Sequence, residues 1–285
     1  MREQFFRNKV LKRNSLTFYL SSLLFPDQVR NDVSVLYTFL RYVDDLVDSV
    51  PQQRNTFYRF RDDCIRAINS GHTDSILIKS FIDLSNRRDF NSQWLIDFLK
   101  SMELDLTKNK YWTLKETLQY IYGSAEVVGL FMANIMSLGQ NSYYYAQLLG
   151  RAMHYIHMIR DIEDDNLLGR TYLPIEDFGL EDLTYTHVIN RREIFIEFMK
   201  KQIDRYMEWQ IEAEKGFALI PRRLLIPIKT SSDMYKWIAR RIELDPFIVY
   251  KRKVVPNIAR HALRMILNAT VYNSGREIVI LNEPK

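Results

Sequence analysis

The sequence predicts an all-α protein that folds as a single-domain helical bundle. Apolar and aromatic residues recur at spacings of three and four along most of the chain, which is the periodicity of helices. Alternating patterns typical of strands are nearly absent. The 285 residues include only 9 Gly and 8 Pro, and no Gly-, Pro- or Ser-rich linker separates the apolar segments. We therefore expect one domain over residues 1–285.

Seven segments carry the helical periodicity, and they are long for a globular protein. In chain order they are 28–49, 53–69, 90–106, 113–138, 142–165, 187–215 and 231–243. Turn-forming residues separate them, at 24-LFPD-27, Pro51, 70-SGHTD-74 and 138-LGQNS-142. A long irregular stretch, 166–179, follows the fifth segment, and loops of that kind often carry functional residues.

The first predicted helix ends in an acidic cluster, 41-RYVDDLVDSV-50. Asp44 and Asp48 are four residues apart, a spacing at which like charges on a helix cost about 0.2–0.5 kcal/mol. One interpretation is a solvated helix end in which Arg41 pairs with Asp44 and Asp45. Acids near a helix C-terminus face the negative end of the helix dipole, however. The alternative interpretation is a divalent cation held by carboxylate oxygens.

A second acidic cluster, 160-RDIEDDNLLGRTYLP-174, ends the fifth predicted helix. Asp161 and Asp165 repeat the spacing of four, Asp164 lies between them, and Arg160 directly precedes them. Two long helices that each end in carboxylates are typical of bundles that hold metal between facing helices. We therefore expect the two clusters to face each other across a cavity.

Crowded carboxylates in a cavity require either raised pKa values or cations that neutralise them. A site of oxygen ligands suits Mg²⁺, which is commonly completed by the phosphates of a substrate. The sequence thus predicts an anionic substrate bridged to the acids by Mg²⁺, with Arg41, Arg160 and Arg170 binding phosphate oxygens. A di-iron bundle would need Glu-x-x-His pairs, and the sequence contains none.

Two histidines lie on the helix before the second cluster. His154 is interpreted as a packing residue. His157 is one turn before Asp161 and shares its face, so it is a candidate metal ligand beside the aspartates.

Composition restricts the remaining possibilities. A net charge of +5 suits an anionic partner, but no nucleic-acid-binding motif accompanies it, so we expect no nucleic acid. Cys64 is the only cysteine, which excludes a disulfide within the chain. Residues 1–15 lack the apolar core of a signal peptide, and the longest apolar run, 127–136, is too short to span a bilayer. We expect a cytoplasmic protein that contacts membranes peripherally.

The order and spacing of several motifs resemble the squalene/phytoene synthases. The strongest are R-x-x-D-D-x-x-D at 41–48 and R-D-x-x-D-D followed by G-R-x-Y-L-P at 160–174. Weaker similarities are 15-SLTF-18, 98-FLKSMELDL-106, 120-YIYGSAEVVG-129 and 247-FIVYKRK-253. The resemblance implies the isoprenoid synthase fold, an all-α bundle around a central cavity. It also implies the joining of two allylic diphosphates through a cyclopropylcarbinyl diphosphate.

The resemblance also implies roles for individual residues. Asp44, Asp48, Asp161 and Asp165 would bind Mg²⁺, with Asp45 and Asp164 in support. Arg41, Ser15 and Thr17 would contact a diphosphate, and Tyr37 and Tyr120 would lie near the reacting carbons. Departure of diphosphate leaves negative charge that Mg²⁺ and Arg can stabilise.

The chain also departs from the family pattern. His154 and His157 stand where the family has Gln and Asn, and a neutral imidazole at His157 would suit Mn²⁺ better than Mg²⁺. The expected reaction is phytoene formation from two geranylgeranyl diphosphates, which needs no NADPH. The alternatives are squalene or dehydrosqualene formation from farnesyl diphosphate, and a non-catalytic relative that acts in assembly or binding.

Overall fold

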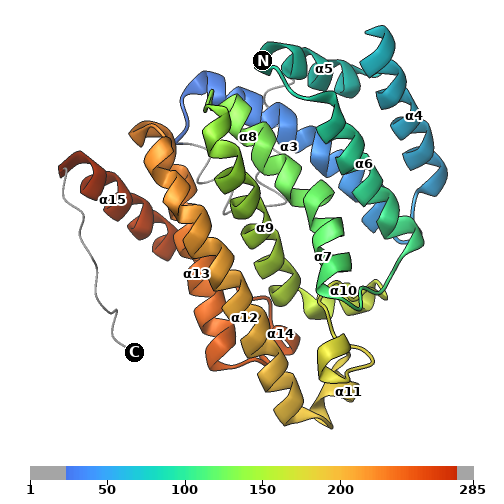
Figure 1. Cartoon of the computed structure of the whole chain (residues 1–285), viewed down its shortest axis with the longest axis vertical. Helices are drawn as coiled ribbons and strands as arrows, with labels where there is room; N and C mark the ends of the chain where they lie inside the picture. The colour runs from blue at the N-terminus through green and yellow to red at the C-terminus, as the bar shows by residue number, and fades with distance from the viewer. Residues whose placement is uncertain (1–23, 275–285) are drawn as a thin grey trace.

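Helices build the computed structural model of this chain, which describes residues 24–274 (Figure 1). The longer ones are α3 (Asp27–Asp48), α4 (Arg54–Ser70), α5 (Ile76–Arg88), α6 (Ser92–Thr107), α9 (Tyr143–Arg160), α12 (Arg192–Glu214), α13 (Arg222–Leu244) and α15 (Ile258–Ser274). The shorter ones are α7 (Leu114–Ile121), α8 (Val127–Ile135), α10 (Ile162–Leu167), α11 (Tyr185–Ile189) and α14 (Ile248–Lys251). Within residues 24–274 the β-structure is limited to an isolated bridge between Lys110 and Thr171. The predicted all-α class is confirmed.

The first group of helices packs around α3. This helix contacts α4, α5, α6 and α8, and its apolar face enters a cluster of buried aromatic and aliphatic side chains. In that cluster the rings of Phe39 and Phe81 stack with centroids 4.2 Å apart. One buried acid, Asp32, is balanced by Arg87 and Arg88 at the end of α5, with ion pairs of 3.0 and 2.6 Å.

The second group packs around α9, which contacts α12 and α13 along its length. Its core cluster includes the fully buried side chains of Tyr155, Phe195 and Phe198. The Tyr155 hydroxyl donates to Gln202, whose side-chain oxygen also accepts from Arg205 at 2.6 Å. Helices α4 and α5 thus lie on one side of the molecule and α13 and α15 on the other (Figure 1).

Glycines allow the two groups to meet at backbone distance. A Cβ atom on Gly150 of α9 would lie 2.4 Å from the carbonyl oxygen of Ala125, and one on Gly129 of α8 would lie 2.1 Å from that of Ala146. Ala125 belongs to a π-helical turn, η1 (Tyr122–Glu126), which interrupts the helix formed by α7 and α8. Turns of this kind are frequent at functional sites.

The predicted helix boundaries differ from the observed ones in several places. Helices α5 and α15 were not predicted, and α13 begins at Arg222 rather than at 231, since the helix includes Pro227. The segment 113–138 is divided by η1. The segment 142–165 is divided at Asp161, whose ψ of 19° leaves helical geometry between α9 and α10.

We expect Gly150→Ala to lower the free energy of unfolding by about 1–3 kcal/mol, because its Cβ has no room against the Ala125 carbonyl. Gly139→Ala is the matched control, since its Cβ would meet only the end of the Asn141 side chain. Urea denaturation of both variants measures the difference. Equal transition midpoints for the two variants would contradict the close backbone contact.

Candidate active site

A cavity of about 930 Å³ lies between the two groups of helices. Its apolar lining includes Met132 and Met136 from α8 and its end, Met153 from α9, and Ile228 and Ile238 from α13. Most of the charged side chains of its lining come from α3, α9, α10 and the segment after α14, and they interact with one another. The cavity thus combines a long apolar surface with one polar end.

The two acidic clusters meet at this polar end. Asp44 and Asp48 from α3 and Asp161 and Asp165 from the α9–α10 junction all line the cavity. Asp45 and Asp164 do not line it and are exposed instead. Asp45 points away from Asp44, and Asp164 from Asp165, because neighbouring residues on a helix point about 100° apart. The structure therefore separates the four cavity acids from the two acids expected to support them.

Arginine and lysine side chains accompany these acids. Arg41 contacts Asp44 at 3.0 Å and Asp45 at 2.6 Å, and Arg160 contacts Asp161 at 2.6 Å. Lys253, from the segment after α14, reaches Asp161 at 3.2 Å and Asp164 at 2.7 Å and also lines the cavity. Its position was not predicted as part of the site, although the weaker family similarity at 247-FIVYKRK-253 includes it.

Arg41 has capacity for a further anion. Its guanidinium lines the cavity, and its Nε atom is buried without a hydrogen-bond partner among residues 24–274. A buried guanidinium N–H requires an acceptor. A phosphate oxygen in the cavity would supply one, which fits the substrate-binding role predicted for Arg41.

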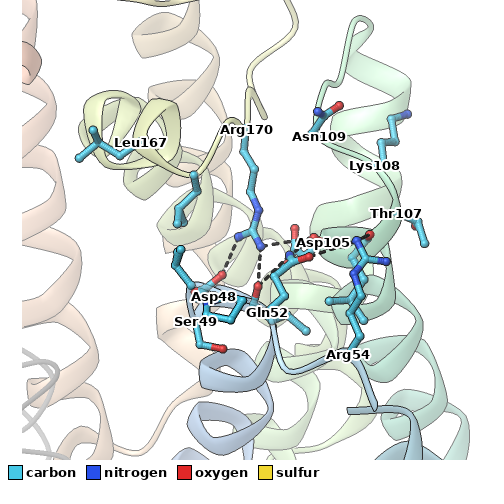
Figure 2. A pocket seen from close by; sticks show the side chains of 15 residues that line it. Asp48, Ser49, Gln52, Arg54, Asp105, Thr107, Lys108, Asn109, Leu167 and Arg170 are labelled. Carbon is cyan, nitrogen blue, oxygen red and sulfur yellow. Dashed lines mark hydrogen bonds and ion pairs between the residues drawn. The ribbon is translucent and has the colours of Figure 1, made fainter. Parts of the chain in front are cut away.

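Arg170 is predicted as a phosphate ligand, but its guanidinium is bonded to protein acceptors. It donates to a carboxylate oxygen of Asp48 at 2.6 Å, to the carbonyls of Val47 at 2.7 Å and Asp105 at 3.3 Å, and to the Tyr172 hydroxyl at 3.2 Å. The residue is only 6% exposed. Figure 2 shows this guanidinium reaching from the loop after α10 to the ends of α3 and α6. It therefore joins three segments that are distant in sequence.

Asp105, at the end of α6, is a site residue that the sequence reasoning did not select. Its carboxylate accepts from the hydroxyls of Tyr120 at 2.8 Å and Tyr172 at 2.6 Å, and it lines the cavity. The rings of Tyr120 and Tyr172 stack with centroids 4.9 Å apart. The motif 98-FLKSMELDL-106, one of the weaker family similarities, pointed to this region, and Asp105 is the only acid of the motif that the structure buries.

The π-helical turn brings Tyr120 into this arrangement. Ser101 of α6 is buried and donates to the carbonyl of Tyr120 at 3.0 Å. A Cβ on Gly123 would lie 2.2 Å from the Ser101 hydroxyl, so η1 packs directly on α6. Tyr37 lines the same cavity from α3. Both tyrosines predicted near the reacting carbons therefore face the cavity.

Carboxylate crowding is visible in the pKa values. Burial and the charge of Asp48 raise the pKa of Asp44 to about 7, although 40% of its side chain remains open to the cavity. Burial and the charge of Asp161 raise the pKa of Asp165 to about 8. Burial also opposes ionisation of Asp161, but the hydrogen bonds and charge of Arg160 outweigh it and lower the pKa of that carboxyl. The acids thus need additional positive charge to ionise together.

A divalent cation suits this donor set, because its ligands would be carboxylate oxygens whose ionisation is suppressed without it. Among residues 24–274, however, no three acidic, histidine or cysteine side chains converge on one point. A cation bound here would take one or two carboxylates from each cluster and complete its shell with water and substrate oxygens, as Mg²⁺ prefers.

Both histidines line the cavity beside aromatic rings. His154 lies against Tyr120 and His157 against Tyr235, with ring centroids 6.0 and 5.0 Å apart. Burial lowers the pKa of His154 to about 4 and lowers that of His157 well below its ordinary value. Both rings are therefore neutral near pH 7, which is the form that binds metal. The ligand role of His157 remains a prediction.

Ser15 and Thr17, predicted to contact diphosphate, lie outside the described residues.

A second, smaller hollow of about 480 Å³ adjoins the polar end of the cavity, and Figure 2 shows side chains that line it, including Arg54 and Lys108. The two hollows share a wall formed by Asp48, Asp105, Leu168 and Arg170. None of the described helices is both long and apolar enough to cross a bilayer.

Comparison with known proteins agrees with the resemblance noted in the sequence. The family model for squalene/phytoene synthase matches residues 11–260. A phytoene synthase from Arthrospira platensis is 28% identical over 83% of this chain and 82% of its own length. A 15-cis-phytoene synthase from Synechococcus elongatus is 27% identical over 87% of this chain and 86% of its own length.

Solved structures show the same fold. A dehydrosqualene synthase solved in complex with a ligand superposes with a TM-score of 0.78 and 20% identity, covering 94% of this chain and 96% of that one. A squalene synthase from Alicyclobacillus acidocaldarius gives a TM-score of 0.75 and 20% identity, covering 85% of this chain and 93% of that one.

In metal-free protein, we expect Asp165→Asn to become more stable than wild type as pH rises from about 5 to about 8. The folded state keeps a proton on Asp165, whose pKa is about 8, while the unfolded state releases it near pH 4. The unfolded state then binds fewer protons, so wild-type stability falls with rising pH. Chemical denaturation at several pH values should show a difference growing by about 1–3 kcal/mol, a figure reduced for water in the cavity.

Asp161→Asn provides the control of opposite sign. The pKa of Asp161 is lowered in the folded state, so its charge stabilises the fold above about pH 4 and this contribution disappears as pH falls through the folded pKa. The variant should therefore be less stable than wild type at pH 7. Stability curves for Asp165→Asn and wild type that run parallel across the interval would show that Asp165 ionises normally.

Proposed function

Because this chain belongs to the squalene/phytoene synthase family and is therefore a prenyltransferase, we propose that it joins two geranylgeranyl diphosphates into phytoene with Mg²⁺. Head-to-head condensation of prenyl diphosphates is the reaction of the family. The choice of geranylgeranyl chains is supported by the phytoene synthases among its relatives. NADPH is not required, because phytoene formation includes no reduction.

One observation carries the proposal: both acidic clusters contribute to the polar end of a cavity whose lining is otherwise mostly apolar. A prenyl diphosphate has the same division, with a charged head and a long hydrocarbon tail. The head would lie among Arg41, Arg160 and Lys253, and the tail along the methionine-rich wall formed by α8 and α9.

The side chains described above account for the chemistry of ionisation. When bound at the carboxylates, Mg²⁺ would supply the positive charge that stabilises departing diphosphate. Arg41 presents an Nε that has no hydrogen-bond partner among residues 24–274, and Lys253 and Arg160 add charge beside Asp161. The apolar lining excludes water from the allylic cation, and the faces of Tyr37 and Tyr120 offer it electron-rich surfaces.

Two alternatives compete with phytoene formation. Squalene or dehydrosqualene synthesis from farnesyl diphosphate is favoured by the fold, which matches a squalene synthase and a dehydrosqualene synthase. A non-catalytic relative would be free to lose mutually repelling carboxylates, yet all four cavity acids remain. We therefore prefer an active enzyme.

Product analysis tests the proposal. Purified protein with Mg²⁺ should convert geranylgeranyl diphosphate into a C40 hydrocarbon without NADPH, as identified by mass spectrometry of the extract. A C30 product from farnesyl diphosphate would replace phytoene formation by the alternative, and its hydrogen count would show whether NADPH was used. No product with either substrate, with Mg²⁺ or with Mn²⁺, would indicate the non-catalytic relative.

Asp48→Asn and Asp161→Asn should each lower turnover by about a hundredfold or more while the fold persists, because each removes one charged oxygen ligand from the polar end. Asp83→Asn, at an exposed position of α5, is the control and should retain full activity. A readout independent of catalysis is the thermal midpoint, which excess Mg²⁺ should raise at pH 8 in wild type and less in either variant. Normal turnover in both variants would rule out the metal role.

His157→Asn should retain activity and shift the metal preference from Mn²⁺ towards Mg²⁺, because an amide oxygen is a harder ligand than imidazole. Turnover measured across a series of both metals provides the ratio. The control is His154→Gln, which lies one turn away against Tyr120. A folded but inactive His157→Asn would instead show that the reaction requires the imidazole.

A further inference from the structure

Helix α15 packs a polar side on the protein and exposes an apolar side, the reverse of an ordinary surface helix. The side that packs on α13 is polar: Asn268 is buried and donates to the Thr230 hydroxyl and to Asp233, both at 3.1 Å. Arg264 approaches the same carboxylate at 3.9 Å, and His261 is 2% exposed. Polar groups therefore hold α15 to α13.

The outward side of α15 is uncharged. Ile258, Leu263 and Ile266 are 59%, 59% and 58% exposed. At 100° per residue they fall within one arc of about 140°. Up to residue 270, the other residues of the arc are also uncharged, namely Ala259, Ala262, Ala269 and Thr270. We call these seven residues the outer α15 face. Arg260 and Arg264 project outside the arc, so charge is confined to the flanks of the apolar surface.

The outer α15 face continues into the mouth of the cavity. Ile258 belongs to the face and also lines the cavity, and Val255, which is 54% exposed, lines it as well. Pro256 lies between them in the same lining. Apolar side chains thus connect the exterior of α15 with the interior that would hold prenyl chains.

Positive charge borders the same mouth. Lys251, Arg252 and Lys253 are all exposed and immediately precede these apolar residues, and Lys253 itself lines the cavity. The net charge of the chain is +5. An exposed apolar helix face bordered by basic residues has the composition of surfaces that lie in the headgroup region of anionic bilayers.

We infer that the outer α15 face docks on an anionic lipid bilayer and sets the cavity mouth against it. The inference rests on the proposed function, because a prenyl substrate dissolves in the bilayer and the apolar side chains at the mouth would let its tail enter without crossing water. The docking occupies the interface only, with Ile258, Leu263 and Ile266 entering the acyl boundary and with Lys251 and Arg252 contacting lipid phosphates.

Flotation of the full-length protein with vesicles tests the docking. Wild type should float with vesicles of phosphatidylcholine and phosphatidylglycerol, less with phosphatidylcholine alone, and less at high salt. The double variant Leu263→Asp/Ile266→Asp should partition at least tenfold more weakly, since each large aliphatic side chain contributes about a decade. Ile211→Asp on α12, where the native side chain is 57% exposed, is the matched control and should bind like wild type.

Activity in detergent micelles separates this inference from the proposed function. Neither Leu263 nor Ile266 lines the cavity, so the double variant should turn over dispersed substrate at the wild-type rate and lose activity only on vesicle-bound substrate. Equal flotation of the double variant and wild type, or no flotation of wild type, would overturn the docking. Sedimentation that shows dimers of wild type and monomers of the double variant would assign the face to a second copy of the chain.

Discussion

The balance of charge around Arg170 holds the polar end of the cavity together. Four cavity acids and Asp105 bring negative charge to one place, and the wall of that place is built from the ends of α3, α6 and α10. Arg170 binds the Asp48 carboxylate and two main-chain carbonyls, so one guanidinium both offsets charge and closes the junction of three segments. Asp44 and Asp165 are less well compensated, since burial and then a neighbouring carboxylate raise their pKa values.

Much of this site follows from local spacing. Asp44 and Asp48 share a helix face because they are four residues apart, and Asp161 lies one turn before Asp165, whose N–H donates to the Asp161 carbonyl at 2.9 Å. The same periodicity explains why Asp45 and Asp164 point elsewhere. The roles of Arg170 and Asp105 could not be obtained this way, since most of their contacts join residues separated by 15 to 123 positions. Helix α15 was not predicted for a related reason. Its polar residues face α13 and its apolar residues face outward, so the apolar residues of this segment do not mark its buried side.

The histidines illustrate how a cavity decides the state of a side chain. Acidic neighbours would favour the charged imidazole, but loss of water around His154 and His157 outweighs them and keeps both rings neutral. Neutral rings add no charge to a region that already depends on Arg170 and Lys253 for balance. They can therefore pack against Tyr120 and Tyr235 as flat, polarisable parts of the wall.

The glycine contacts between α8, η1 and α9 have a consequence for how enzymes of this shape can diverge. Gly129, Gly150, Ala125 and Ala146 all line the cavity, and along this wall one main chain rests on another. Almost no side-chain volume there can be removed by substitution, so the width of the cavity at that level is fixed by the separation of the two main chains. Its length is a different matter, because flexible methionines such as Met132, Met136 and Met153 form the neighbouring lining. Point substitutions in this fold can thus change the length of the hydrocarbon that the cavity accommodates, while the width of the cavity stays constant.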